Sequence, residues 1–107
     1  MADPPIACDL GTLDDDERNL RAQILADLRR ALRGFAELQD GFEVILDLNH
    51  CSRVDLERLI EFENRCCSFL HFEPTYREEG ALVRITGPPG SKAILAAELG
   101  LANWMPE

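Results

Sequence analysis

The segment from residue 56 to residue 70 constrains this chain more than any other, because it carries a clear helical pattern with ionisable groups inside it. At about 100° per residue, its apolar side chains fall on one arc of a helix and its charged and polar side chains fill the other. The apolar set is Leu56, Leu59, Ile60, Phe62, Phe69 and Leu70. We therefore predict an amphipathic helix that ends near Leu70.

Glu63 is the exception to this pattern. It lies near the middle of the apolar arc, with Cys66 at i+3 on one side and Cys67 at i+4 on the other. A carboxylate in an apolar setting is unfavourable unless it is paired or protonated. Glu63 therefore needs a cation, a metal ion or an exchangeable proton as its partner, and this patch is the main indication of function in the sequence.

The remaining segments alternate between strand and helix patterns. Each is set by apolar residues at a spacing of two, three or four, and each is bounded by Gly or Pro. The predicted elements are a strand at 4–10 with Cys8 facing inward, a helix at 13–39, a strand at 42–48, the helix that ends near residue 70, a hairpin with arms at 71–78 and 81–86, and a last helix at 91–99.

This order, β-α-β-α-β-β-α, predicts the α+β class: a two-layer sandwich with the helices on one face of a small mixed sheet. We expect residues 1–107 to form a single α+β domain, since this length can bury a core without disulfide or metal staples. Pro74 lacks a backbone N–H, which predicts that the first hairpin arm is an edge strand.

Charge and hydropathy limit the partners that we expect. The net charge of −9 would repel nucleic acid and anionic lipid, and no apolar run approaches the ~18 residues of a membrane span. The first residues lack the pattern of a secretory signal peptide. We therefore expect a cytoplasmic protein with reduced thiols, without nucleic-acid or membrane partners.

The four cysteines are Cys8, Cys51, Cys66 and Cys67. Two thiols on one helical turn, joined by Cys8 from a strand that packs on the helix, form a set of soft-metal donors. We predict a metal site made of Cys8, Cys66, Cys67 and Glu63. Zinc prefers four tetrahedral ligands, whereas Hg(II), Cu(I) and As(III) accept two or three sulfurs, so the identity of the metal or metalloid ion stays open.

Two other functions fit the same residues. In the first, the protein is an enzyme in which Cys66 or Cys67 attacks a small thiol-reactive molecule and Glu63 carries the proton. In the second, the cysteines only pack, and the domain is a non-catalytic interaction module that forms a homodimer, for example through an uncovered sheet edge.

Three further polar residues have open roles. Arg21 could be the buried partner of Glu17, one helical turn away, or of Glu63 across the core, and we favour the first as a semi-exposed pair. His50 and His71 could be ligands or bases, but each is more commonly a surface or capping histidine.

The N-terminal Cys8-Asp9-Leu10, the acidic and arginine-bearing first helix and the stretch from Glu63 to Leu70 together resemble a set of small, mostly uncharacterised bacterial proteins. These share an early CxL and an ExxCCx[FW] helix motif, and the resemblance spans nearly the whole chain. It implies that Cys8, Glu63, Cys66 and Cys67 are the motif positions. A heavy-metal association is what the resemblance leads us to expect.

Overall fold

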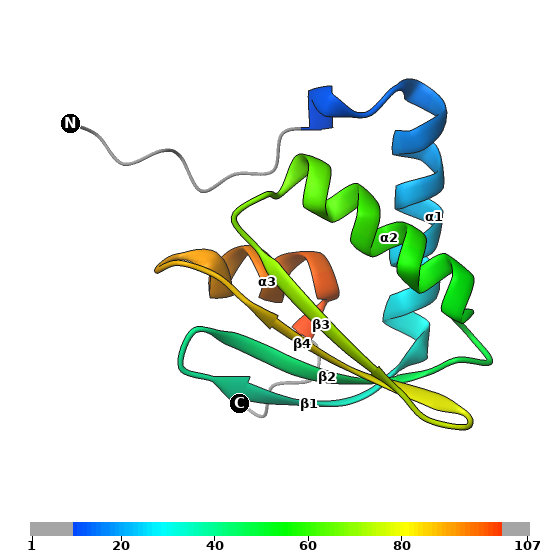
Figure 1. Ribbon diagram of the computed structural model, residues 1–107, viewed down its shortest axis with the longest axis vertical. Helices are drawn as coiled ribbons and strands as arrows, with labels where there is room; N and C mark the ends of the chain where they lie inside the picture. Colours follow the sequence, from blue (N-terminus) through cyan, green and yellow to red (C-terminus); the bar gives the residue numbers. More distant parts are fainter. Residues whose placement is uncertain (1–9, 102–107) are drawn as a thin grey trace.

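The computed structural model describes residues 10–101, which form three helices and four strands after a short 3-10 helix (Figure 1). The α+β class is confirmed. The strand predicted at 4–10 lies outside the described residues, apart from Leu10 in the 3-10 helix. The elements are η1 (Leu10–Thr12), α1 (Asp15–Ala31), β1 (Leu32–Leu38), β2 (Gly41–Asp47), α2 (Arg53–Cys66), β3 (His71–Tyr76), β4 (Gly80–Thr86) and α3 (Ser91–Leu99).

The four strands form one sheet in the order β1-β2-β4-β3. Each hydrogen-bonded pair is antiparallel, so the sheet of the described chain is antiparallel and the expected mixture of directions is not found. Two hairpins, β1–β2 and β3–β4, are joined through their inner strands. β3 lies at an edge with Pro74 at its centre, as predicted from the missing N–H of proline.

The three helices lie on the same side of this sheet (Figure 1). Phe42, Val44 and Leu46 of β2 are buried beneath them, and they alternate with half-buried or exposed residues that face the other side. This period of two is the pattern of a sheet with one face covered. The predicted two-layer arrangement, with helices on one face, is confirmed.

The helix predicted at 13–39 is too long, because α1 ends at Ala31 and the chain continues as β1. The apolar residues of this part recur at intervals that suit a helix, yet they pair along β2, with Phe35 opposite Val44. Leu38 pairs with Gly41 across a two-residue turn at Gln39 and Asp40. Pairing with a neighbouring strand therefore overrides the local periodicity, and Gly34 is a strand residue.

The helix predicted to reach Leu70 ends at Cys66. Cys67 is its C-cap, with φ −124° and ψ 59°, and its N–H donates to the carbonyl of Glu63 at 2.6 Å. Of the three residues Glu63, Cys66 and Cys67, the first two are therefore in the helix. Cys67 belongs to the turn that leads into β3.

The start of α1 is tied to the end of α2 by one arginine. Asp14 and Glu17 form a capping box at the start of α1. Arg65 donates to both carboxylate oxygens of Glu17, at 2.6 and 3.2 Å, and to the carbonyl of Thr12 at 2.8 Å. The segment that follows Cys8 in the sequence is thereby held against the cysteine end of α2. No helix in residues 10–101 has the length and apolar character needed to cross a membrane.

Candidate metal centre

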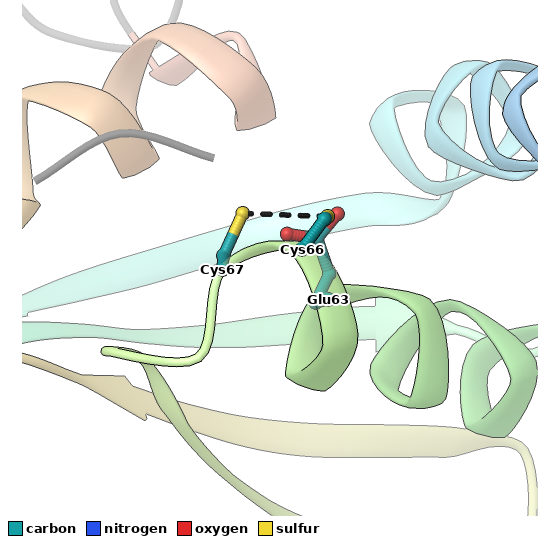
Figure 2. A group of neighbouring side chains, drawn as sticks. All are labelled: Glu63, Cys66 and Cys67. Carbon is teal, nitrogen blue, oxygen red and sulfur yellow. Dashed lines mark hydrogen bonds between the residues drawn. The ribbon is translucent and has the colours of Figure 1, made fainter. Parts of the chain in front are cut away.

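Glu63, Cys66 and Cys67 lie together at the C-terminal end of α2 and point into the core (Figure 2). Their exposed fractions are 3%, 3% and 0%. The three-residue step from Glu63 to Cys66 keeps both on the buried face of the helix, and the turn at Cys67 brings the second sulfur back beside the first. The predicted convergence of one carboxylate and two cysteines is therefore present.

The donor atoms are close enough to share one ion. The two sulfur atoms are 3.6 Å apart, and the sulfurs and a Glu63 carboxylate oxygen all lie within 4.8 Å of one another. Within residues 10–101, no other group of three or more His, Cys, Asp or Glu side chains has its donor atoms this close together.

Glu63 has one paired and one unpaired oxygen. Oε1 accepts a 2.7 Å hydrogen bond from Nε of Arg21, whereas Oε2 is buried and has no hydrogen-bond partner in the described chain. Burial, together with the nearby Glu98 carboxylate, raises the pKa of Glu63 to about 7, although Arg21 acts in the opposite direction. Glu63 can therefore gain or lose a proton near neutral pH.

Arg21 connects α1 to this site. Of its two expected partners it pairs with Glu63, while Glu17 pairs with Arg65, so the preference for a Glu17 pair was wrong. Only 10% of the Arg21 side chain is exposed, and its second hydrogen bond, from Nη2, goes to Glu98 at 2.8 Å. Burial works against the cation, but the Glu63 and Glu98 carboxylates outweigh it and raise the pKa of Arg21.

Glu98, on α3, is the site residue that the sequence reasoning missed. Its carboxylate lies on Arg21, and its backbone carbonyl accepts a 2.9 Å hydrogen bond from Arg29, two turns further along α1. A small cavity of about 20 Å³, with room for roughly one water molecule, borders Glu63 and Glu98. The sequence does carry a sign of this role, because Glu98 is the one acidic residue in an otherwise apolar run from Ala93 to Leu99.

The oxidation state of the cysteines differs from the expectation of four reduced thiols. Cys67 is disulfide-bonded, whereas Cys51 and Cys66 are free thiols. Cys8, the other predicted donor, lies outside the described residues. A soft ion binds thiolates, so Cys67 can act as a donor only after reduction.

The two free thiols have different settings. Burial, reinforced by the Glu63 charge, raises the pKa of Cys66. Burial raises the pKa of Cys51 to about 11, with smaller contributions from Asp55 and Asp27. Cys51 lies in the loop before α2 and packs in the core as a small apolar residue, outside the candidate metal group.

Neither histidine belongs to the site. His50 lies beside Asp47 and Arg33 after β2, at 3.0 and 3.2 Å from them. His71 pairs with Glu73 at the exposed start of β3. The interpretation of both as surface histidines agrees with these positions.

No protein-family model matches this chain, and no curated protein or solved structure shows significant similarity to it. Function is therefore inferred from the residues and the geometry of the site.

Proposed function

We propose that the reduced protein binds a soft metal ion through the thiolates of Cys66 and Cys67, with the Glu63 carboxylate as an oxygen donor. The observation that carries this proposal is the buried Glu63 Oε2, which has no partner in the described chain and lies in a group with two sulfurs. Buried polar atoms normally have a partner. A metal ion supplies one that also suits the sulfurs.

The charges around Glu63 favour a cation. Two carboxylates, Glu63 and Glu98, share the single guanidinium of Arg21. When both are ionised, the buried group carries an excess negative charge. Burial is the main cause of the raised pKa of Glu63, and the Glu98 carboxylate adds to it, whereas Arg21 lowers this pKa. A bound metal ion would compensate this charge and would keep the Cys66 thiol deprotonated.

The sulfur spacing favours a tetrahedral ion. Metal–sulfur bonds of about 2.3 Å place two sulfurs about 3.8 Å apart at a tetrahedral angle and about 4.6 Å apart in linear coordination. With Cys67 disulfide-bonded, the sulfurs of Cys66 and Cys67 are 3.6 Å apart. If both side chains keep these positions on reduction, Zn(II) and ions of similar geometry would fit with less movement than a linearly coordinated ion such as Cu(I) or Hg(II).

Cys8 is the donor that we propose for the fourth position. The hydrogen bonds from Arg65 hold Thr12 and Glu17 at the end of α2, and Cys8 precedes this anchored segment by only a few residues. Cys8, Cys66, Cys67 and Glu63 would together provide three sulfurs and one oxygen, which is a suitable set for a tetrahedral ion in a reducing cytoplasm.

Catalysis by these thiols is less well supported. All three side chains are buried, so a substrate larger than an ion or a water molecule could reach them only after the site opens. The raised pKa of Cys66 also leaves this thiol protonated at neutral pH, whereas an attacking cysteine must be a thiolate.

The metal content of protein purified under reducing conditions tests this proposal. We expect the unaltered chain to retain about one equivalent of a soft metal ion, as measured by elemental analysis. Cys66→Ser should lose it, and Cys51→Ser, which changes a buried cysteine outside the group, should keep it. Equal metal content in the unaltered chain and in folded Cys66→Ser would overturn the proposal.

A further inference from the structure

β1 is an edge strand with one open side. It pairs with β2, and no strand of the described chain pairs with its other side (Figure 1). The backbone N–H and C=O groups along an open strand edge are a template for another strand. Arg33, Ala36 and Glu37 of this strand are exposed, so its edge is within reach of a partner.

The two edges of the sheet differ in how well they could accept a strand. Pro74 at the middle of β3 has no backbone N–H to donate, which disfavours pairing at that edge. β1 contains no proline. Its one irregularity is a β-bulge between Leu32 and Gly34, at the start of the strand, and Gly34–Leu38 is regular. β1 is therefore the edge better suited to pair with a further strand.

The sequence of β1 is complementary to itself when read in the opposite direction. Phe35 is its middle residue, and Arg33 and Glu37, with opposite charges, lie two positions to either side. In an antiparallel pair of two such strands centred on Phe35, Arg33 of each copy faces Glu37 of the other, and Gly34 faces Ala36. Opposite charges that face each other across two strands are stabilising, whereas like charges are destabilising.

Other registers of β1 with its own copy lack this match. A twofold axis perpendicular to the sheet keeps the helices of both copies on one face, and paired residues of an antiparallel ladder share a face, so each register is centred on one residue. Centring on Arg33 or Glu37 places like charges opposite each other. Centring on Gly34 or Ala36 places Phe35 opposite a charged residue. Centring on Phe35 pairs Arg33 with Glu37 and overlaps the strand over its whole length.

We propose that two copies of this chain associate through antiparallel pairing of their β1 strands, centred on Phe35. The two sheets then form one continuous sheet with the β1 strands in its middle, and each copy contributes the same surface to the interface. The half-buried Phe35 of each copy meets its counterpart at the axis, which adds an aromatic contact to the backbone hydrogen bonds. This interface does not depend on the proposed metal site.

The two charged residues can make the new contact without losing their present ones. Arg33 donates to Asp47 at 2.9 Å and to backbone carbonyls of its own segment, and Glu37 pairs with Lys92 at 3.3 Å. The Arg33 and Glu37 side chains are 47% and 61% exposed. A guanidinium has five N–H donors and a carboxylate has two acceptor oxygens, so each group can hold a second partner.

Sedimentation equilibrium over a wide range of protein concentrations tests the proposal. The net charge of −9 opposes association, so the reduced, chelator-treated protein is measured at physiological salt, where charges more than about 8 Å apart are largely screened. We expect the unaltered chain to change from monomer to dimer as its concentration rises. A chain that stays monomeric at every concentration would overturn the proposal.

Charge reversal tests the register. Arg33→Glu and Glu37→Arg each place like charges opposite each other at two symmetry-related positions, so each should raise the dissociation constant by about 10-fold or more. A mixture of these two variants should restore dimers, because opposite charges face each other again in the heterodimer. Circular dichroism checks that each variant is folded. Equal dimer strength in folded Arg33→Glu, or a mixture no stronger than its components, would contradict the register.

Glu73→Arg is the matched control, because it reverses an exposed glutamate on the other edge strand. It should dimerise as strongly as the unaltered chain. Hydrogen exchange of the unaltered chain gives a test that needs no variant: on passing from the monomer to the dimer range of concentration, backbone amides of β1 should gain protection and those of β3 should not. Weaker dimers in Glu73→Arg, or protection gained in β3 instead of β1, would overturn the assignment to β1.

Discussion

At the scale of single residues, the buried Glu63 carboxylate has two oxygens with different surroundings. The position of Glu63 inside an apolar arc predicted a buried carboxylate that needs a partner. In the structure, one of its two oxygens has such a partner. Arg21 satisfies Oε1, while Oε2 has no partner among the described residues. The identity of that arginine could not be deduced from spacing, because Glu17 at i−4 and Glu63 across the core were both within its reach.

The raised pKa of Glu63 makes a prediction about stability. Its pKa is about 7 in the folded chain, against 4.5 for an unperturbed glutamate, so between these values the folded protein holds a proton that the unfolded chain has lost. The contribution of Glu63 to the free energy of unfolding is therefore complete below pH 4.5, and it is lost as the pH rises through 7. The whole loss is about 3 kcal/mol.

We therefore expect Glu63→Gln, treated with reductant and chelator, to lose less stability than the unaltered protein between pH 4.5 and pH 7.5, by about 3 kcal/mol. Urea unfolding at both pH values measures this difference. Glu61→Gln, an exposed position on the same helix, is the matched control and should follow the unaltered chain. Parallel pH profiles for all three proteins would show that Glu63 titrates normally.

At the scale of secondary-structure elements, the sequence predicted most boundaries within a few residues. The strand at 42–48, the hairpin arms and the last helix correspond to β2, β3, β4 and α3. At β1, pairing with a neighbouring strand decided between two local patterns. β1 carries helix-compatible spacing but pairs with β2, and the end of α2 turns at Cys67 although Phe69 and Leu70 continue its apolar arc.

The β1–β2 hairpin gives a test of this sheet assignment. A side chain on Gly41 would place its Cβ 1.8 Å from the backbone oxygen of Ile85 on β4, a contact that only movement of a strand can relieve. At Gly34 the nearest atom is the flexible Ile45 Cδ1 at 3.8 Å. Within one hairpin, Gly41 is therefore a position without room for a side chain, and Gly34 is a position with room for one.

We expect Gly41→Ala to destabilise the fold by about 3 kcal/mol or more. Gly34→Ala should be neutral or stabilising by up to about 1 kcal/mol, because alanine restricts the unfolded chain and meets no clash. Thermal unfolding followed by circular dichroism measures both. Equal effects at the two positions, or a tolerated Gly41→Ala, would contradict the register of β2 against β4.

At the scale of the whole molecule, the site depends on all three helices. α1 supplies Arg21, α2 supplies Glu63 and Cys66, and α3 supplies Glu98. Sequence reasoning found the α2 residues because they share one helical face. It missed Glu98, which is 35 positions from Glu63 in the chain and reaches it only through packing of α3 beside α1.

The other face of the sheet is uncovered by the described chain. Ile45 on this face is 51% exposed, and β1 and β3 form the two edges. A homodimer through an edge, and the absence of nucleic-acid partners expected from the net charge of −9, stay predictions.

The most direct test of metal binding is a Co(II) titration of the reduced, chelator-treated protein, because Co(II) reports thiolate ligands and tetrahedral geometry in one absorption spectrum. We predict a thiolate-to-cobalt band that saturates at about one equivalent in the unaltered chain and in Cys51→Ser. The band should be absent or greatly weakened in Cys66→Ser, and Glu63→Gln should bind about 10–100-fold more weakly. A spectrum without a thiolate band, or the same band in folded Cys66→Ser, would contradict the metal site at the end of α2.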